Sequence, residues 1–324
     1  MSSPKINVAA LVVTYNRKEL LVECLAAVAA QEFAPSSVVV IDNASTDGTE
    51  ELFRDGGVLA GTPGLHYFRM GENLGGAGGF KEGIRRCMEA DCDWVWLMDD
   101  DCIARPDTLA GLVSALPAAE RLGGAPSFLA SSVLGPEGEP MNVPVLDTRP
   151  TKNGYADWYL GLSDSLVEIE CATFVSLLVN ARAVERFGLP IASFFIWGDD
   201  TEYTTRLTHN FGPAYLVGGS SVMHKRVNAK NLSILNEEDP ARIANFHRLY
   251  RNNLVVKRYH YGKKLATRQV ASNLKNALRC LFVGSGGFSA RRARSGALLR
   301  GTFEFLCGKY DLEDLARLVG CGVK

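Results

Sequence analysis

Acidic residues are missing from a long stretch near the C-terminal end of this 324-residue chain. No Asp or Glu lies between Asp239 and Glu304, although that stretch contains 14 Lys and Arg residues. The whole chain has a formal net charge of −1, so the remaining residues carry −15. Charge segregated in this way indicates an anionic partner, which can be a membrane surface, a phosphate-bearing substrate or nucleic acid.

Long apolar runs and paired cysteines are missing as well. No stretch approaches 18 uninterrupted apolar residues, which argues against a membrane-spanning helix. The eight cysteines form no Cys-x-x-Cys pair and do not have the spacing typical of metal ligands. The N-terminus has no signal-peptide pattern, so we expect reduced thiols in a cytoplasmic protein. The hydrophobic content of 47% and charged content of 22% are typical of a globular fold with a large core.

The first hundred residues alternate between short apolar runs and segments of helical spacing. Helices are expected over residues 17–31, from about Thr49, and over 80–90, with a glycine-rich loop at 71–79. Four strands are expected, at residues 8–14, 38–41, 66–69 and 93–98. This alternation predicts an α/β fold with a mostly parallel sheet, whose ligands bind at the carboxyl ends of the strands.

The rest of the chain divides into a second half of the sheet and a basic helical region. A helix is expected after residue 104, a core strand and its continuation over Val167–Val179, and another strand over Ala214–Val222. Beyond Pro240 the pattern becomes helical and the charge basic. We therefore expect an α/β domain at 1–235 and a basic C-terminal helical region at 236–324.

Three adjacent carboxylates, Asp99, Asp100 and Asp101, end the fourth expected strand. Alternate side chains of an extended segment point the same way, so Asp99 and Asp101 can converge on one point while Asp100 turns aside. Hard oxygen ligands of this kind suit Mg²⁺ or Mn²⁺, ions that also hold substrate phosphates. The alternative is an acidic turn or helix cap before Pro106.

Two other strand ends carry hydrogen-bonding side chains. Residues 14–17 are Thr-Tyr-Asn-Arg, and residues 42–48 are Asp-Asn-Ala-Ser-Thr-Asp-Gly. Each segment alone is typical of a capped helix start. Together they would lie on neighbouring strand ends, where Asp42 can accept a hydrogen bond from a base or a ribose hydroxyl.

The motifs VVTYNR, VVVIDNASTDGT, NLGGAGGF and the acidic triplet occur in this order over residues 8–225, a pattern that resembles the inverting family 2 glycosyltransferases of GT-A fold. The resemblance implies a nucleotide-sugar donor and a divalent metal ion, Mn²⁺ or Mg²⁺. It assigns Asp99 and Asp101 to the metal-bound diphosphate, with an orienting or sugar-contacting role for Asp100. It also assigns five residues around the base and ribose, Thr14, Tyr15, Asn16, Arg17 and Asp42, together with the neighbouring Asn43.

The glycine-rich segment from Asn73 to Phe80 indicates which sugar is transferred. It lacks the Gly-Lys-Ser/Thr ending of a Walker A loop. Glycines such as Gly75 and Gly76 let backbone N–H groups approach a ligand at a helix N-terminus. The segment resembles the loop of bacterial galactofuranosyltransferases, which implies UDP-galactofuranose. Rhamnosyltransferases that use a dTDP-sugar have a similar loop and remain the alternative.

A second acidic motif, residues 197–206, begins with Trp-Gly-Asp-Asp-Thr-Glu. Its carboxylates would complement a helix N-terminus in any protein. An inverting transfer also needs a base for the acceptor hydroxyl, and the family carries it in this motif. We expect Asp200 as the base with Asp199 as runner-up. Expected acceptor contacts are Glu202, Trp197 and Trp158, and the resemblance implies that His224 completes the metal site.

The basic region is expected to attach the protein peripherally to the inner face of the cell membrane. Residues 273–283 alternate cations with apolar residues at helical spacing, as interfacial helices do. The acceptor would then be a saccharide, in particular a lipid-linked one used in cell-surface polysaccharide assembly. A nucleic-acid-binding role is the distant alternative, and no recognised binding motif supports it. The acceptor, the linkage, the number of sugars added and the presence of a homo-oligomer stay open.

Overall fold

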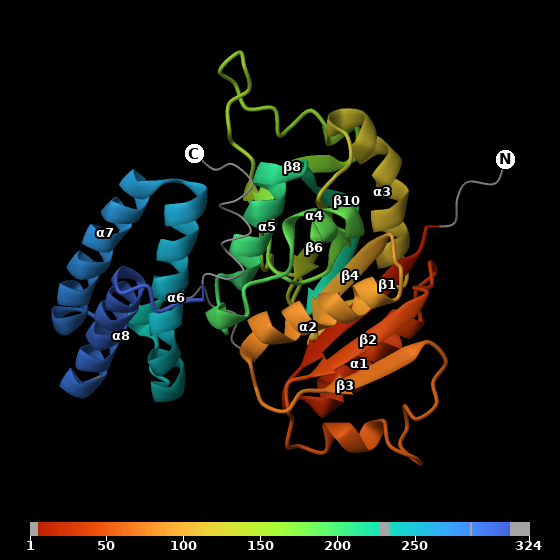
Figure 1. Ribbon diagram of the computed structural model, residues 1–324, viewed down its shortest axis with the longest axis horizontal. Helices are drawn as coiled ribbons and strands as arrows, with labels where there is room; N and C mark the ends of the chain where they lie inside the picture. Colours follow the sequence, from red (N-terminus) through yellow and green to blue (C-terminus); the bar gives the residue numbers. More distant parts are fainter. Residues whose placement is uncertain (1–5, 227–232, 286, 312–324) are drawn as a thin grey trace.

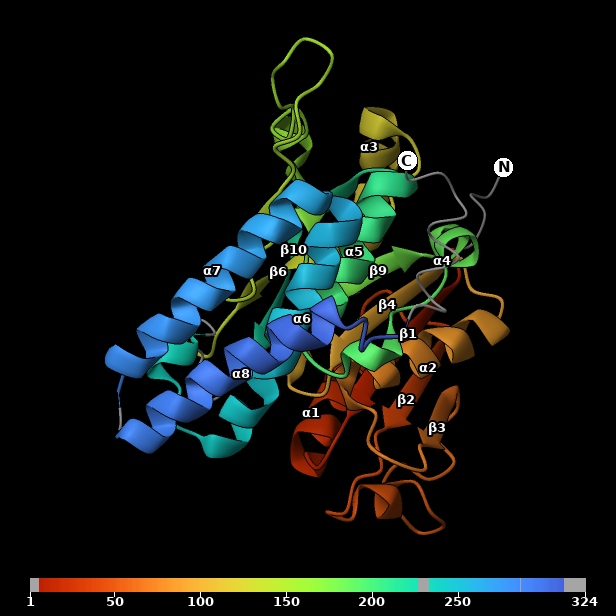
Figure 2. The same ribbon diagram turned by 60° about the vertical axis from the view of Figure 1, so that its left-hand side comes forward.

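The computed structural model describes residues 6–226, 233–285 and 287–311 (Figure 1). Within these residues ten strands form one sheet in the order β3-β2-β1-β4-β9-β6-β10-β8-β7, with β5 paired to β10. Helices cover both faces of the sheet, and a bundle of three helices lies to one side (Figures 1 and 2). The expected α/β architecture is confirmed.

The N-terminal half of the sheet is parallel. Its strands are β1 (Val8–Thr14), β2 (Ser37–Asp42), β3 (Leu65–Arg69) and β4 (Trp94–Asp99). Alternate residues of β1 pack on opposite faces, since Ala10 and Val12 meet α1 (Lys18–Ala29), while Leu11 and Val13 meet α2 (Gly75–Glu89). Burial on both faces explains why these strands read as continuous apolar runs.

The second half of the sheet is mixed. The strand β9 (Leu177–Asn180) runs antiparallel between β4 and β6 (Phe128–Leu134), and the long β10 (Ala214–His224) is parallel to β6. On the far side of β10 lies β8 (Leu166–Cys171), and two short strands, β5 (Cys102–Ala104) and β7 (Val145–Leu146), complete the sheet. The helices of this half are α3 (Thr108–Gly123), α4 (Ala181–Phe187) and α5 (Asp199–Asn210).

Three sequence-based expectations about local structure were wrong. The helix expected from Thr49 is a single 3₁₀ turn, Thr49–Leu52, and further short 3₁₀ turns lie at Leu162–Asp164, Ala192–Phe194 and Ile234–Asn236. The continuous segment expected over Val167–Val179 is two strands in different positions of the sheet. Helix α2 begins at Gly75 rather than at residue 80, because its glycines pack closely instead of forming an open loop.

The basic region forms three helices, α6 (Pro240–His260), α7 (Lys263–Phe282) and α8 (Phe288–Leu306). Asp239 caps α6 by accepting a hydrogen bond from the Ala241 N–H, and Pro240 occupies the first turn, where no donor is lost. Helix α6 lies nearest to the sheet domain and α7 lies on the outside (Figures 1 and 2). Among the described residues, no helix combines the length and the apolar character needed to cross a bilayer.

Candidate active site

The polar strand ends meet at one edge of the sheet. Because β2, β1 and β4 are adjacent and parallel, their last residues, Asp42, Thr14 and Asp99, lie side by side. The carboxyl edge of a parallel sheet is where α/β proteins bind ligands. The convergence expected from the sequence is therefore present in the fold.

Hydrogen bonds join the turns that follow β1 and β2. Asn16, with a positive φ of 54°, donates its N–H to Ser45 Oγ at 2.8 Å and accepts the Thr46 N–H on its Oδ1 at 2.6 Å. The neighbouring Tyr15 is 43% exposed. The structure therefore gives Asn16 a role in holding the two turns together and leaves Tyr15 open to a ligand.

Asp42 is fully buried, and both its carboxylate oxygens have partners within the protein. Oδ1 accepts the Ser45 N–H at 2.8 Å, and Oδ2 accepts the Tyr67 hydroxyl at 2.6 Å. Asn43 lies beside it and donates to the Gly75 carbonyl at 3.0 Å. Both side chains thus shape the floor of the site, and contact of Asp42 with a nucleotide stays a prediction.

The acidic triplet lies in a tight turn rather than on an extended segment, since β4 ends at Asp99 and β5 starts at Cys102. Asp100 turns away and accepts the Thr14 hydroxyl at 2.7 Å. Arg17 donates to Asp101 at 2.6 Å and to Asp100 at 3.3 Å. Asp100 is thus an orienting residue that ties the triplet to the end of β1.

Three side chains of different elements form a group that could hold a metal ion. Asp99, Asp101 and His224, the last residue of β10, each offer a ligand atom, and these atoms lie within 4.8 Å of one another. His224 Nε2 lies 2.9 Å from Asp101 Oδ1, and its Nδ1 lies 2.9 Å from Asn142 Oδ1. A second polar partner of this kind fixes the ring orientation of a ligating histidine.

Electrostatics favour a cation at this group. Burial raises the pKa of Asp99 well above its ordinary value, and the charges of Asp101 and Asp100 add to the effect. Burial also raises the pKa of Asp101, but His224 and Arg17 outweigh it and lower that pKa. The half-buried Asp99 and the buried Asp101 supply the carboxylate oxygens that suit Mn²⁺ or Mg²⁺, and His224 adds a nitrogen ligand.

The glycine turn packs between the strand ends and the loop before α5. Asn73 Oδ1 accepts the Gly75 N–H at 2.8 Å, and Gly75 has a φ of +71°. A Cβ on Gly75 would lie 2.0 Å from the Phe195 carbonyl oxygen, whereas a Cβ on Gly76 would meet open space. Gly75 therefore serves close backbone packing, and the backbone at Gly76 remains accessible.

Asp199 and Asp200 occupy the first turn of α5, next to the metal-ligand group. Asp199 is 6% exposed and close enough to Asp99 to influence its ionisation. Burial, followed by the charge of Asp200, raises the pKa of Asp199 to about 8. Asp200 is half-buried, and its Oδ1 accepts hydrogen bonds from the Thr201 N–H at 2.6 Å and the Thr201 hydroxyl at 3.3 Å.

The three expected acceptor contacts lie in different surroundings: Glu202 is withdrawn from solvent, whereas Trp197 is half-buried and its contact with an acceptor stays a prediction. Glu202 is fully buried in a salt bridge with Arg206 at 2.5 Å and a contact with His260 at 3.0 Å. The Trp197 ring packs against Phe246 of α6, with ring centroids 5.1 Å apart. Both side chains therefore join the sheet domain to the C-terminal helices.

Trp158 lies at the other end of α5. Its carbonyl accepts the Glu168 N–H, and its neighbour Asp157 lines a polar hollow together with Asn210 and Tyr215. Asn210 is the last residue of α5, and a helix of that length spans about 18 Å. The structure therefore does not bring Trp158 to the site.

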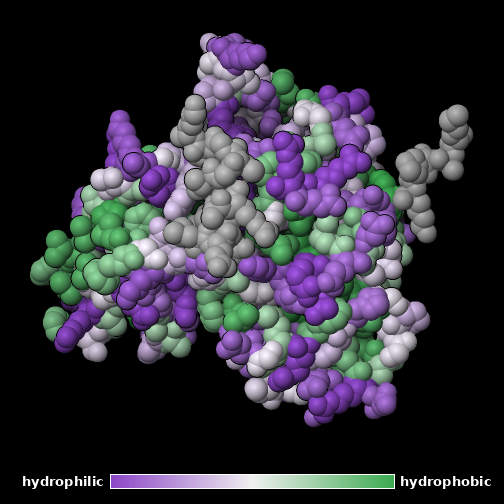
Figure 3. Space-filling view, in the orientation of Figure 1, coloured by the Kyte–Doolittle hydropathy of each residue, from purple (hydrophilic) through white to green (hydrophobic). Residues whose placement is uncertain are grey.

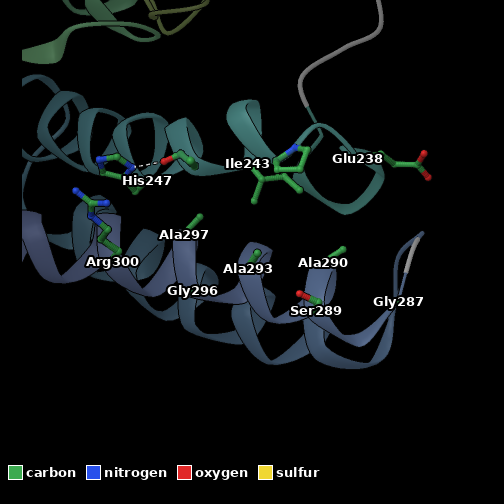
Figure 4. A pocket seen from close by; sticks show the side chains of 12 residues that line it. Glu238, Ile243, His247, Gly287, Ser289, Ala290, Ala293, Gly296, Ala297 and Arg300 are labelled. Carbon is green, nitrogen blue, oxygen red and sulfur yellow. Dashed lines mark hydrogen bonds between the residues drawn. The ribbon is translucent and has the colours of Figure 1, made fainter.

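The cavity in Figure 4 is separate from the strand ends. It has a volume of about 530 Å³ and lies between α6 and α8, lined largely by small and apolar residues such as Ile243 and Ala293. Glu238 is the single carboxylate among its lining residues. Among the described residues, the group of possible metal ligands is Asp99, Asp101 and His224, which lies at the edge of the sheet and not in this cavity.

Comparison with known proteins identifies the family. The model of "Glycosyl transferase family 2" matches residues 9–142. Galactofuranosyltransferase GlfT1 of Mycolicibacterium smegmatis is 31% identical over 221 residues, covering 67% of this chain and 70% of the relative. The chain belongs to glycosyl transferase family 2. A GlfT1 of Mycobacterium tuberculosis is also 31% identical, over 62% of this chain and 64% of the relative's own length.

Solved structures of glycosyltransferases share the fold. S. aureus TarS 1–349 in complex with UDP-GlcNAc has a TM-score of 0.54 at 14% identity and covers 98% of this chain and 79% of its own. GalNAc-T7 with UDP, GalNAc and Mn2+ has a TM-score of 0.59 at 13% identity, covering 98% of this chain and 58% of its own. At these identities the likeness concerns the GT-A fold alone, and with family membership it identifies a glycosyltransferase.

The sequence did not predict two sets of contacts, one at the metal-ligand group and one at Glu202. Asn142 contacts His224, and Arg206 with His260 neutralises Glu202. An i, i+4 Glu-Arg spacing was visible for Glu202 and Arg206 and could have indicated a pair. No spacing signal links Asn142 or His260 to its partner, because those contacts arise from tertiary packing.

Proposed function

We propose that this family 2 enzyme is an inverting, metal-dependent galactofuranosyltransferase that uses UDP-galactofuranose. The observation that carries the donor is the 31% identity to a galactofuranosyltransferase over 67% of this chain. The glycine turn at Asn73–Phe80 supports it, because Gly76 leaves the backbone open beside the strand ends. Tyr15 and Arg17 are exposed enough to contact the nucleotide.

The group of Asp99, Asp101 and His224 would hold Mn²⁺ or Mg²⁺. Their ligand atoms, within 4.8 Å of one another, fit one ion. Once bound, such an ion would offset the charge that develops on the diphosphate leaving group. Asp100 and Arg17 would orient the two carboxylates, since both hold the triplet in its turn.

Asp200 is proposed as the catalytic base, with Asp199 as the alternative. The acceptor hydroxyl oxygen attacks the anomeric carbon of the donor from the face opposite the diphosphate, and its proton passes to the Asp200 carboxylate. The bond between the anomeric carbon and the phosphate oxygen breaks, and UDP leaves. Partial exposure of Asp200 supports this choice over the buried Asp199.

The acceptor is proposed to be a lipid-linked saccharide, reached by peripheral attachment to an anionic membrane. On α7 the exposed residues Leu274, Leu278 and Phe282 lie on one stripe, and Arg268, Lys275 and Arg279 lie on the adjacent stripe. Figure 3 shows apolar surface, in green, at the outer edge of the C-terminal helices. Lysine and arginine beside an apolar stripe are typical of interfacial helices.

The test of the base is Asp200→Asn, measured by UDP release with UDP-galactofuranose. General-base catalysis contributes roughly 10²–10⁴-fold, so turnover should fall by that order while UDP binding in the presence of Mn²⁺ is retained. Asp101→Ala should instead weaken metal-dependent UDP binding, as calorimetry with and without Mn²⁺ can measure. Unchanged turnover in Asp200→Asn rejects the base assignment.

A further inference from the structure

The loop that precedes Asp199 has an unusual backbone. Phe195 and Trp197 have φ values of 64° and 63°, and Gly198, which caps α5, has a φ of 90°. Residues with side chains rarely adopt positive φ, and such a conformation persists only where the surroundings hold it in place. The position of Asp199 and Asp200 therefore depends on what holds this loop.

A buried amide of the C-terminal region forms several of the hydrogen bonds that hold this loop. Asn252 of α6 is fully buried, and its Nδ2 donates to the carbonyls of Phe194 at 3.1 Å, Ile196 at 3.3 Å and Trp197 at 2.7 Å. An amide has two N–H donors, so it serves the three carbonyls through a shared hydrogen bond. These carbonyls flank the residues with positive φ.

The neighbouring Arg251 orients this amide. Its Nε donates to Asn252 Oδ1 at 3.0 Å, which leaves Nδ2 facing the loop, and its Nη2 donates to the Ser193 carbonyl at 2.7 Å. On the other side of the loop, the Ala77 N–H of α2 donates to the Phe195 carbonyl at 3.2 Å. The loop is thus held between α6 and the glycine turn.

We propose that Asn252 is a positioning residue of the transferase, which fixes the loop 194–198 so that the Asp199–Asp200 pair meets the metal-ligand group. The C-terminal helices then contribute to catalysis as well as to attachment. The inference rests on the proposed function in one respect, the catalytic role of the aspartate pair. Asn252 acts through the backbone and contacts no substrate.

The test compares Asn252→Asp and Asn252→Ala with Asn245→Ala. Aspartate keeps the shape of asparagine but cannot donate to the carbonyls. Asn245 lies on the same helix, donates to the Ala241 carbonyl of that helix and accepts a hydrogen bond from Arg248, which stacks on Phe195. Asn245→Ala therefore controls for the loss of an α6 asparagine that does not hydrogen-bond the loop carbonyls. Misplacing a catalytic group by about 1 Å can cost about 100-fold. In both Asn252 variants kcat should fall by about 10–100-fold, with the donor KM and the Kd for UDP and Mn²⁺ within about twofold.

Hydrogen exchange measured by mass spectrometry provides a readout that needs no donor. Amides of residues 194–202 should exchange faster in Asn252→Ala than in Asn245→Ala, while those of α2 and β1 stay unchanged. If the Asn252 variants do not fold, Gly198→Ala disturbs the same contact, because its Cβ at φ +90° would lie 3.2 Å from Asn252 Cβ. It should lower kcat in the same way.

Two results would overturn the proposal. One is unchanged kcat and unchanged exchange of 194–202 in folded Asn252 variants or in Gly198→Ala. The other is an equal loss of kcat and UDP binding, which indicates general destabilisation. In an Asp200→Asn background, Asn252→Ala should cost no further activity. A wild-type enzyme inactive with UDP-galactofuranose contradicts the proposed function, whereas the exchange result still decides the role of Asn252.

Discussion

At the scale of single residues, the acidic side chains around the site have distinct tasks. Asp100 holds the triplet to Thr14, Asp42 holds the turn after β2, and Glu202 neutralises Arg206. The carboxylates that remain for metal binding or catalysis are Asp99 and Asp101, which belong to the metal-ligand group, and the half-buried Asp200. The number of acidic residues in a sequence motif is therefore larger than the number of carboxylates that can contact a substrate.

Glu202 predicts a pH dependence of stability. Burial raises its pKa, but Arg206 and His260 outweigh burial and lower the pKa from 4.5 to about 2. Because the folded-state pKa lies below the unfolded one, the stabilisation is complete above pH 5 and is lost as the pH falls toward 2. Glu202→Gln should lower the free energy of unfolding at pH 7 by about 3 kcal/mol, and this deficit should shrink in acid.

Urea unfolding at several pH values measures this effect. Glu89→Gln is the matched control, because Glu89 is an exposed partner of Arg85 and such pairs contribute about 1 kcal/mol or less. A deficit for Glu202→Gln that stays constant from pH 7 to pH 2.5 would show that ionisation of Glu202 does not stabilise the fold.

At the scale of secondary-structure elements, α7 differs from α6. Helix α6 carries Asn252 and Phe246 toward the sheet domain, whereas α7 turns one face inward and leaves the other to solvent. Its inward residues include Ala266, Asn273, Ala277 and Cys280, and its outer face carries no acid. This division supports the proposal that α7 contacts an anionic surface.

The α7 surface predicts salt-dependent binding to anionic vesicles. Each Lys or Arg near an anionic leaflet contributes about 1 kcal/mol, so removing Lys275 and Arg279 together should weaken binding by about tenfold or more. Phe282→Ser should weaken it through lost apolar contact. Co-sedimentation with vesicles containing phosphatidylserine measures both effects at several salt concentrations.

Matched controls lie on the sheet domain. Val58 is 77% exposed, as is Phe282, so Val58→Ser tests whether any exposed apolar residue matters, and Arg54→Ala tests charge alone. Both controls should bind vesicles as the wild type does. Absence of vesicle binding by the wild-type protein at every salt concentration would contradict the proposed membrane attachment.

At the scale of the whole molecule, the sequence predicted the sheet edge well and the helix contacts poorly. Asp99 and Asp101 could be predicted because they follow a strand whose carboxyl end lies at the ligand-binding edge of the sheet. The place of His224 came from the family resemblance, since β9 and β6 separate β10 from β4. The contacts of Trp197 with Phe246 and of Glu202 with His260 were not predicted, since these partners lie on α6, far along the chain (58 residues for Glu202 and His260). Sequence motifs record which residues follow a strand but not which helix later packs on them.

The central claim, inverting transfer from UDP-galactofuranose at the strand-end site, is tested most directly by analysis of the product. The wild-type enzyme, Mn²⁺ and a small panel of lipid-linked saccharides should be incubated with UDP-galactofuranose or dTDP-rhamnose, and the product examined by NMR. We predict a galactofuranosyl product whose anomeric configuration is opposite to the donor's, with UDP released. Retention of the donor's configuration, or transfer from dTDP-rhamnose alone, would contradict the account.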